Sequence, residues 1–202
     1  MTIILGAIGI LLGLITSIYM LHINIRELII KHNKSMYIII ASSVFMMIIT
    51  VLLYKRYGLT YQFISLEITA WLLISISITD IKYKEVNINI IIFSVILGVI
   101  LLVINQNIKW YESLIGLFGI GGILVGISYI TKGSIGMGDA YVIGVTGLLL
   151  GYKMAIAILL YSLVLSSILG IILMILGKVN RKTRLPMVPF ILSAFIIIQF
   201  MQ

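Results

Sequence analysis

The sequence predicts an all-α polytopic membrane protein with about eight transmembrane helices. Hydrophobic residues make up 62% of the 202-residue chain, whereas soluble domains contain roughly 45–50%. The apolar residues gather in runs, and a helix that crosses a hydrocarbon core of ~30 Å needs ~20 of them. Charged residues are 10% of the chain and fall mainly between the runs. Composition and spacing together exclude a soluble domain.

The apolar runs follow one another along the chain. The sixth is short, and the turn that separates it from the seventh is expected at Gly151. Residues 2–21 carry no charge and are not followed by a small-residue cleavage site, so we expect them to remain as a membrane anchor. The expected spans are about 3–21, 36–54, 60–79, 87–104, 113–130, 139–151, 154–176 and 186–201.

The basic residues predict the orientation, because Lys and Arg are enriched in cytoplasmic loops. With the N-terminus outside, ten of them lie in cytoplasmic loops and four in outer loops. This imbalance favours an N-out, C-out topology for a single domain, 1–202, with only a short cytoplasmic loop at 22–35. The cytoplasmic set is Arg26, Lys31, Lys34, Lys82, Lys84, Lys132, Lys178, Arg181, Lys182 and Arg184; the outer set is Lys55, Arg56, Lys109 and Lys153.

Composition also removes several kinds of site. The chain has no cysteine, which excludes disulfides, thiol catalysis and thiolate metal ligands. Its two histidines, His22 and His32, do not by themselves make a metal site. The net charge is +8, but no basic run is long enough to predict nucleic-acid binding. We therefore expect no metal and no nucleic-acid partner, with the lipid bilayer as the surroundings.

Acidic residues are few, six in all, and a charge in or beside a span is costly and often functional. In the predicted topology Asp80 closes the third span and Asp139 opens the sixth, both on the cytoplasmic side. Glu67 lies inside the third span near its outer end, where we expect a role in packing or topology. Asp80 and Asp139 are therefore the candidate chemical groups.

An aspartic protease of the membrane requires at least two carboxylates, and these can come from different helices at one membrane face. Within hydrogen-bond range they cannot both ionise readily, so they share one proton. The ionised group then acts as general base on a water, while the protonated partner donates to the scissile carbonyl, without a cofactor. We expect Gly136 and Gly138 to allow positive φ, to aim Asp139 at Asp80 and to admit substrate backbone.

Three motifs follow one another in the chain. They are Ile-Thr-Asp-Ile-Lys-Tyr-Lys at 78–84, Gly-Met-Gly-Asp at 136–139, and Leu-Pro-Met-Val-Pro-Phe at 185–190. In this order they resemble the motifs of bacterial type IV prepilin peptidases, membrane aspartic proteases with a Gly-x-Gly-Asp signature. The likeness covers roughly residues 60–200. In it, Asp80 and Asp139 match the family's catalytic pair.

The resemblance implies a multi-pass enzyme of the bacterial inner or plasma membrane, with its active site facing the cytoplasm. Such an enzyme removes the basic leader from prepilins or pilin-like membrane proteins. A transmembrane groove beside the carboxylates would receive the hydrophobic helix of the substrate. Gly136, Gly138, Pro186 and Pro189 would support the site or contact the substrate.

The chain departs from the family pattern in several places. Larger members carry a cytoplasmic domain after the first span, often with paired cysteines for zinc, and many methylate the new amino terminus with S-adenosylmethionine. Here the loop 22–35 is short and lacks cysteine, so we do not expect methyltransferase activity. Asn87, Tyr141 and Val188 stand where the family commonly has Pro, Lys and Gly. None of these differences removes a carboxylate.

Other interpretations remain open. Asp139 and Asp80 could be ordinary helix-end residues, the first stabilised by the helix dipole and the second solvated beside Lys82 and Lys84. An ion-coupled transporter using these acids or Glu67 predicts inverted repeats, and no convincing repeat is present. A preflagellin peptidase would keep the same chemistry with another substrate. The sequence gives neither the particular substrate nor the oligomeric state.

Overall fold

A computed structural model describes residues 1–20, 34–104, 108–131, 136–178, 180 and 185–201. Every regular element in these ranges is helical, which confirms the predicted all-α class. Most of the predicted loop 22–35, with His22 and His32, lies outside the described residues. The helices are α1 (Thr2–Met20), α3 (Lys34–Tyr57), α4 (Tyr61–Tyr83), α5 (Ile88–Ile104), α6 (Trp110–Leu114), η1 (Ile115–Gly121), α7 (Gly122–Ile130), α8 (Met137–Leu150), α9 (Tyr152–Ile175) and α10 (Val188–Met201).

Helix length separates these elements into two groups. Among the described residues, four helical stretches are long and apolar enough to cross a membrane: Met36–Tyr57, Tyr61–Tyr83, Trp110–Ile130 and Tyr152–Ile175. The third of these stretches comprises α6, the π-helix η1 and α7 in succession. Shorter apolar helices occupy Thr2–Ile18, Ile88–Ile104, Met137–Leu150 and Val188–Met201. The chain is therefore a helical membrane protein, and the eightfold span count stays a prediction.

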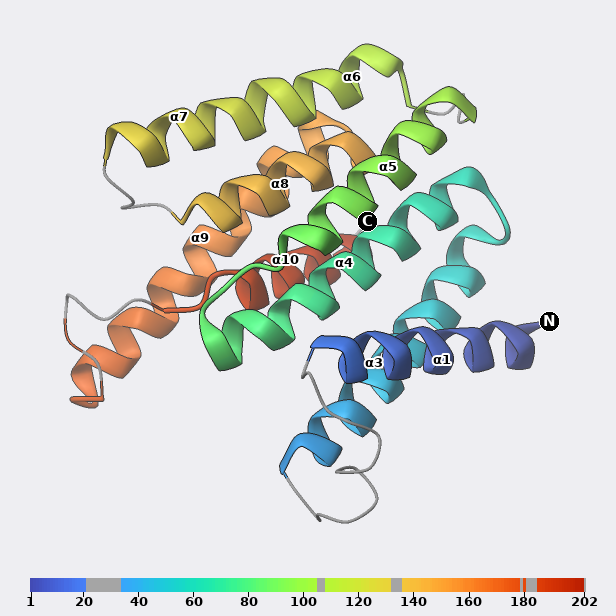
Figure 1. The fold of residues 1–202 in the computed structure, drawn as a ribbon, viewed down its shortest axis with the longest axis horizontal. Coiled ribbons are helices and arrows are strands. Elements are labelled where there is room, and N and C mark those ends of the chain that lie inside the picture. Colours follow the sequence, from blue (N-terminus) through green and yellow to red (C-terminus); the bar gives the residue numbers. More distant parts are fainter. Residues whose placement is uncertain (21–33, 105–107, 132–135, 179, 181–184, 202) are drawn as a thin grey trace.

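Two helices form the centre of the bundle (Figure 1). In α4, residues 72–80 are buried without interruption, and in α8 residues 142–149 are buried in the same way. Protein therefore surrounds these stretches on all sides, which is typical of the central helices of a bundle. Accordingly, α4 packs on α1, α3, α5, α8 and α10, and α8 packs on α4, α5, α6, η1, α7 and α9. The candidate carboxylates Asp80 and Asp139 belong to these two central helices.

Glycines bring α8 into backbone contact with its neighbour η1. A Cβ added to Gly147 would lie 2.7 Å from the Cα of Gly116, and one added to Gly121 would lie 2.8 Å from the Cα of Gly144. Small residues such as glycine let helix backbones approach closely in a membrane. At its far end α8 stops at Leu150, and Gly151 turns the chain with φ +84°. The turn predicted at Gly151 is confirmed.

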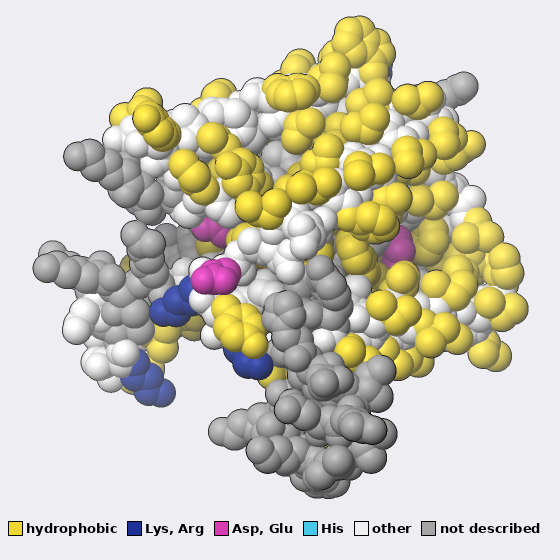
Figure 2. Space-filling model, viewed as in Figure 1, with side chains coloured by type: hydrophobic (Ala, Val, Ile, Leu, Met, Phe, Trp, Pro, Cys, Tyr) yellow, Lys and Arg dark blue, Asp and Glu magenta, His cyan; other side chains and the backbone are white. Residues whose placement is uncertain are grey.

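The outer surface is largely hydrophobic, as a lipid-facing surface requires. Figure 2 shows apolar side chains covering much of one face of the molecule. In α9, exposed apolar residues include Leu160, Val164, Ile168 and Ile175. An exposed apolar surface of this extent marks a membrane or protein contact in a folded chain. Charged residues of the described chain gather instead near helix ends, among them Lys82, Lys84, Glu85 and Lys178.

Candidate active site

Asp80 lies in the last turn of α4 and is buried, with 6% of its surface exposed. The helix ends just beyond it, where Lys84 takes a left-handed conformation with φ 55° and its N–H donates to the Asp80 carbonyl. Lys82 and Lys84 are themselves exposed. Asp80 is thus enclosed by protein, unlike the solvated helix-end residue that one interpretation of the sequence describes.

A backbone donor from another helix holds the Asp80 carboxylate. The N–H of Val188 donates to Asp80 Oδ2 at 2.9 Å, in buried surroundings. The Met187 backbone and the charge of Lys84 also act on this carboxylate. Val188 is the first residue of α10, and the first N–H groups of a helix have no partner within the helix. The Asp80 carboxylate therefore accepts a hydrogen bond from the first turn of α10. Its negative charge also lies at the positive end of the dipole of that helix.

This contact explains the motif at 185–190 in structural terms. Pro189 lies in the first turn of α10, where proline is favoured because its missing N–H is not needed. Val188 precedes it and is fully buried, and its backbone N–H is the one that reaches Asp80. Sequence reasoning placed Pro186 and Pro189 near the site but missed the amide of Val188. A proline in the first turn of a predicted helix was the available signal, because it marks free N–H groups nearby.

Asp139 lies in the first turn of α8 and is half-buried. Its carboxylate turns back over the start of the helix, since a Cβ added to Gly136 would lie 2.6 Å from Asp139 Oδ2. A Cβ added to Gly138 would lie 2.7 Å from the Cβ of Val86, in the segment that joins α4 to α5. Both glycines therefore make room, one for the carboxylate and the other for the chain that follows Asp80.

The expectation of positive φ at these glycines is wrong. Gly136 has φ −61° and ψ 128°, an extended conformation that any residue adopts, and Gly138 lies within α8. Among the described glycines, positive φ occurs at Gly58, Gly151 and Gly177. Steric crowding explains Gly136 and Gly138 better than backbone freedom does. Glycine patterns alone do not distinguish these two causes, because both require the absence of a Cβ.

The fold brings Asp80 and Asp139 within electrostatic range of each other, although they are 59 residues apart in the sequence. Asp80 lies close enough to exert an electrostatic effect on Asp139, while no hydrogen bond joins these two described carboxyl groups in this structure. Their helices α4 and α8 pack directly. The charge of one carboxyl group therefore disfavours ionisation of the other. Groups coupled in this way titrate as a pair.

Glu67 belongs to a different part of the molecule. It precedes Asp80 by 13 residues on α4, which is about 20 Å along a helix. Its Oε1 lies 2.6 Å from Thr50 Oγ1 of α3, and its Oε2 is buried with no hydrogen-bond partner among the described residues. Glu67 thus links α3 to α4 and does not join the other two carboxylates.

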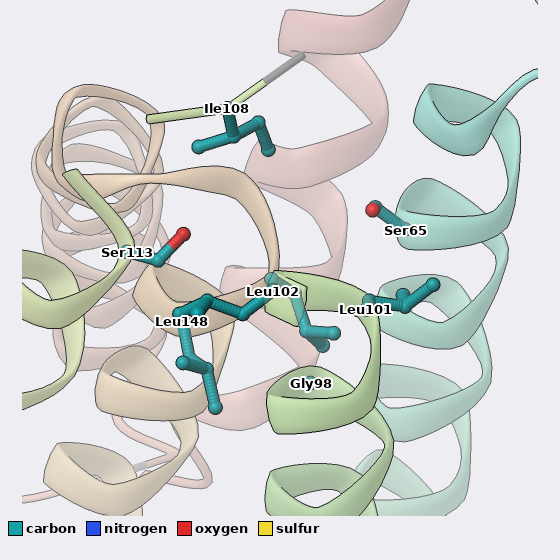
Figure 3. A pocket seen from close by; sticks show the side chains of 8 residues that line it. Ser65, Gly98, Leu101, Leu102, Ile108, Ser113 and Leu148 are labelled. Carbon is teal, nitrogen blue, oxygen red and sulfur yellow. The ribbon is translucent and has the colours of Figure 1, made fainter. Parts of the chain in front are cut away.

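A cavity lies between α4, α5, α6 and α8, also far from the carboxylates (Figure 3). Its volume is about 10 Å³, which is the space that a single water needs. Ser65 and Ser113 present hydroxyls on opposite sides of it in Figure 3, among Gly98, Leu101 and Leu148. Ser65 lies about 22 Å along α4 from Asp80. The cavity is too small and too distant to take a peptide substrate at the carboxylates.

Comparison with known proteins gives a consistent result. The model of the type IV leader peptidase family matches residues 68–175, which include Asp80 and Asp139. A curated relative from Bacillus subtilis (strain 168), named prepilin leader peptidase/N-methyltransferase, is 28% identical over 142 residues. That match covers 70% of this chain and 57% of the relative, so the chain spans little more than half of the relative's length. No solved structure matches.

Proposed function

The chain belongs to the type IV leader peptidase family, and from this premise we propose that it is an aspartic endopeptidase of the membrane. Its substrates are prepilins or pilin-like membrane proteins, from which it removes the leader. The curated relative's name supports the peptidase activity and the class of substrate. The observation that supports the aspartic mechanism is the electrostatic interaction between Asp80 and Asp139, which lie at the ends of the two central helices.

The surroundings of the two carboxyl groups suit different roles. Val188 N–H donates to Asp80. A hydrogen bond from a backbone N–H is stronger when the carboxyl group that accepts it is ionised. In the proposed reaction Asp80 keeps the charge and removes a proton from the attacking water. Asp139 carries the shared proton and donates it to the oxygen of the scissile carbonyl. Asp80 then passes the proton that it took from water to the nitrogen of the leaving amine as the peptide bond breaks, and Asp139 takes back a hydroxyl proton of the intermediate. Both carboxyl groups thus return to their starting states without a cofactor.

The setting of the site defines where the substrate must enter. Asp80 and Asp139 lie near the helix ends where Lys82, Lys84 and Lys178 are exposed. We assign this end to the cytoplasm, within an eight-span, N-out and C-out topology of a single domain in the bacterial plasma membrane. The hydrophobic helix of the substrate would lie in the bilayer against the bundle, with its leader at the cytoplasmic surface.

The proposal concerns cleavage, without methyl transfer. The relative's name includes N-methyltransferase, but in this chain only the residues 22–35 separate the first two apolar runs, and they include no cysteine. We expect a mature substrate with an unmodified amino terminus. Mass spectrometry of the processed substrate measures this directly, and an added methyl group on the first residue would contradict the expectation.

A panel of co-expressed substrates tests the function. The chain is expressed with several prepilins, a preflagellin-type precursor and a membrane protein that has no leader. We expect the prepilins to be shortened and the last protein to stay intact, as judged by gel mobility and intact mass. Cleavage of the preflagellin-type precursor alone would assign the chain to the other substrate class. Cleavage of none of them would remove the peptidase proposal.

A further inference from the structure

A second cavity lies between α9 and the segment that leads into α10. Its volume is about 250 Å³. Ser166 and Ser167 line it from α9, and Leu185, Pro186 and Met187 line it from the other side. In Figure 1 the chain entering α10 runs alongside α9. The helices α9 and α10 pack on each other.

The cavity and the candidate active site share a stretch of backbone. Met187 forms part of the cavity wall, and its backbone acts on the Asp80 carboxylate. The next residue, Val188, donates the hydrogen bond to Asp80 Oδ2. One stretch of chain, Met187 and Val188, thus borders both the cavity and the Asp80 carboxylate.

The lining indicates the chemistry of the occupant. Three of the five lining residues are apolar, the other two carry neutral hydroxyls, and none is charged. An apolar cavity of about 150 Å³ is large enough to hold benzene, so 250 Å³ accepts a bulky aliphatic or aromatic side chain. Met187 adds adaptability, since methionine side chains follow the shape of what they contact.

We infer that this cavity is a specificity pocket for an apolar side chain of the peptide substrate, next to the bond that is cut. The inference rests on the proposed peptidase function and names the residues that select the substrate. Ser166 and Ser167 on α9 set the width of the pocket, and Met187 forms the wall nearest to Asp80. A lipid chain in the same cavity is the competing occupant, and it would give no dependence on the substrate side chain.

Substrate series with paired variants test the pocket. Two series of one cleaved prepilin carry Ala, Leu or Phe, one series before the cut bond and the other after it. Ser167→Phe places a ring in the cavity. In one of the two series it should lower the cleavage rate of the Phe or Leu substrate, relative to that of the Ala substrate, by about tenfold or more. Discrimination of this size is typical when a side chain no longer fits an apolar pocket. Ile168→Phe adds the same ring at an exposed position on α9 and should leave that ratio unchanged.

The opposite change gives a second measurement. Met187→Ala enlarges the cavity and should shift the preference toward the larger side chain, even if Ser167→Phe fails to accumulate in the membrane. Unchanged ratios in both series, with the unmodified chain still cleaving, would overturn the pocket and leave the peptidase proposal standing. A uniform loss for all side chains would also overturn it, in favour of lipid. Lack of any cleavage by the unmodified chain would remove the proposed function itself.

Discussion

Replacing Val188 with proline tests whether a single backbone N–H holds Asp80 in its working state. Proline removes the N–H that donates to Asp80 Oδ2 at 2.9 Å, while its fixed φ suits the first turn of α10. A hydrogen bond to a charged group contributes about 1.5–3 kcal/mol. At 1.4 kcal/mol per factor of ten, its loss should lower kcat by roughly 10- to 150-fold. KM should change little, because the amide contacts Asp80 and not the substrate.

Val188→Ala is the matched control for this experiment. Alanine keeps the N–H but removes two methyl groups from a fully buried side chain, which lowers stability by roughly 1–2 kcal/mol. Both variants therefore lose side-chain packing, and only the proline variant loses the donor. The assay measures initial cleavage rates of a prepilin at several concentrations in detergent, normalised to folded protein. Equal kcat values for the two variants would refute the role of the amide.

Further predictions concern the glycines and Glu67. Gly138→Ala should cost about 1–3 kcal/mol of overpacking and most of the cleavage activity, because its Cβ would meet the Cβ of Val86 at 2.7 Å. Adding Val86→Gly should recover activity, and Gly122→Ala, where nothing lies within 4 Å, should be harmless. If the double variant did not regain cleavage activity, the effect of Gly138 would not arise from its contact with Val86. Thr50→Val should lower the melting temperature of the detergent-solubilised protein, because it leaves the buried Glu67 carboxyl without its partner, at about 1–3 kcal/mol. Glu67→Gln should keep near-normal cleavage, and its complete loss would place Glu67 in the chemistry.

The expectation for Glu67→Gln follows from the number of hydrogens at this contact. Thr50 Oγ1 lies 2.6 Å from Glu67 Oε1 and 2.8 Å from the carbonyl oxygen of Met46. A hydroxyl has one hydrogen and two acceptor positions, so it donates to one of these oxygens at a time. A glutamine amide can donate to Thr50 while Thr50 donates to Met46. The substitution therefore preserves a satisfied pair between α3 and α4.

Much of the fold follows from the apolar runs in the sequence. Each expected span corresponds to a helical segment whose bounds differ by a few residues, because in a bilayer the backbone must satisfy its own hydrogen bonds. Gly151 was predictable as a turn, since a glycine followed by Tyr152 and Lys153 interrupts the long run 139–176. The π-helix η1 was not, because its glycine contacts with α8 depend on tertiary packing.

The candidate site was predictable in part. Charge counting placed Asp80 and Asp139 at one membrane face, and the structure brings them within electrostatic range. The hydrogen bond from Val188 was missed because a backbone N–H leaves no mark in a side-chain pattern. Gly138 was noticed for the wrong reason, since its crowding against Val86 arises from a residue more than fifty positions away in the sequence.

The most direct test of the central claim is cleavage of a co-expressed prepilin by Asp80→Asn and Asp139→Asn variants. Asparagine keeps the size of the side chain and its hydrogen-bonding capacity, and it removes the acid and base chemistry. Both variants should accumulate in the membrane at wild-type levels and leave the prepilin at full length. Normal processing by either variant would contradict the assignment of the two carboxylates as the catalytic pair.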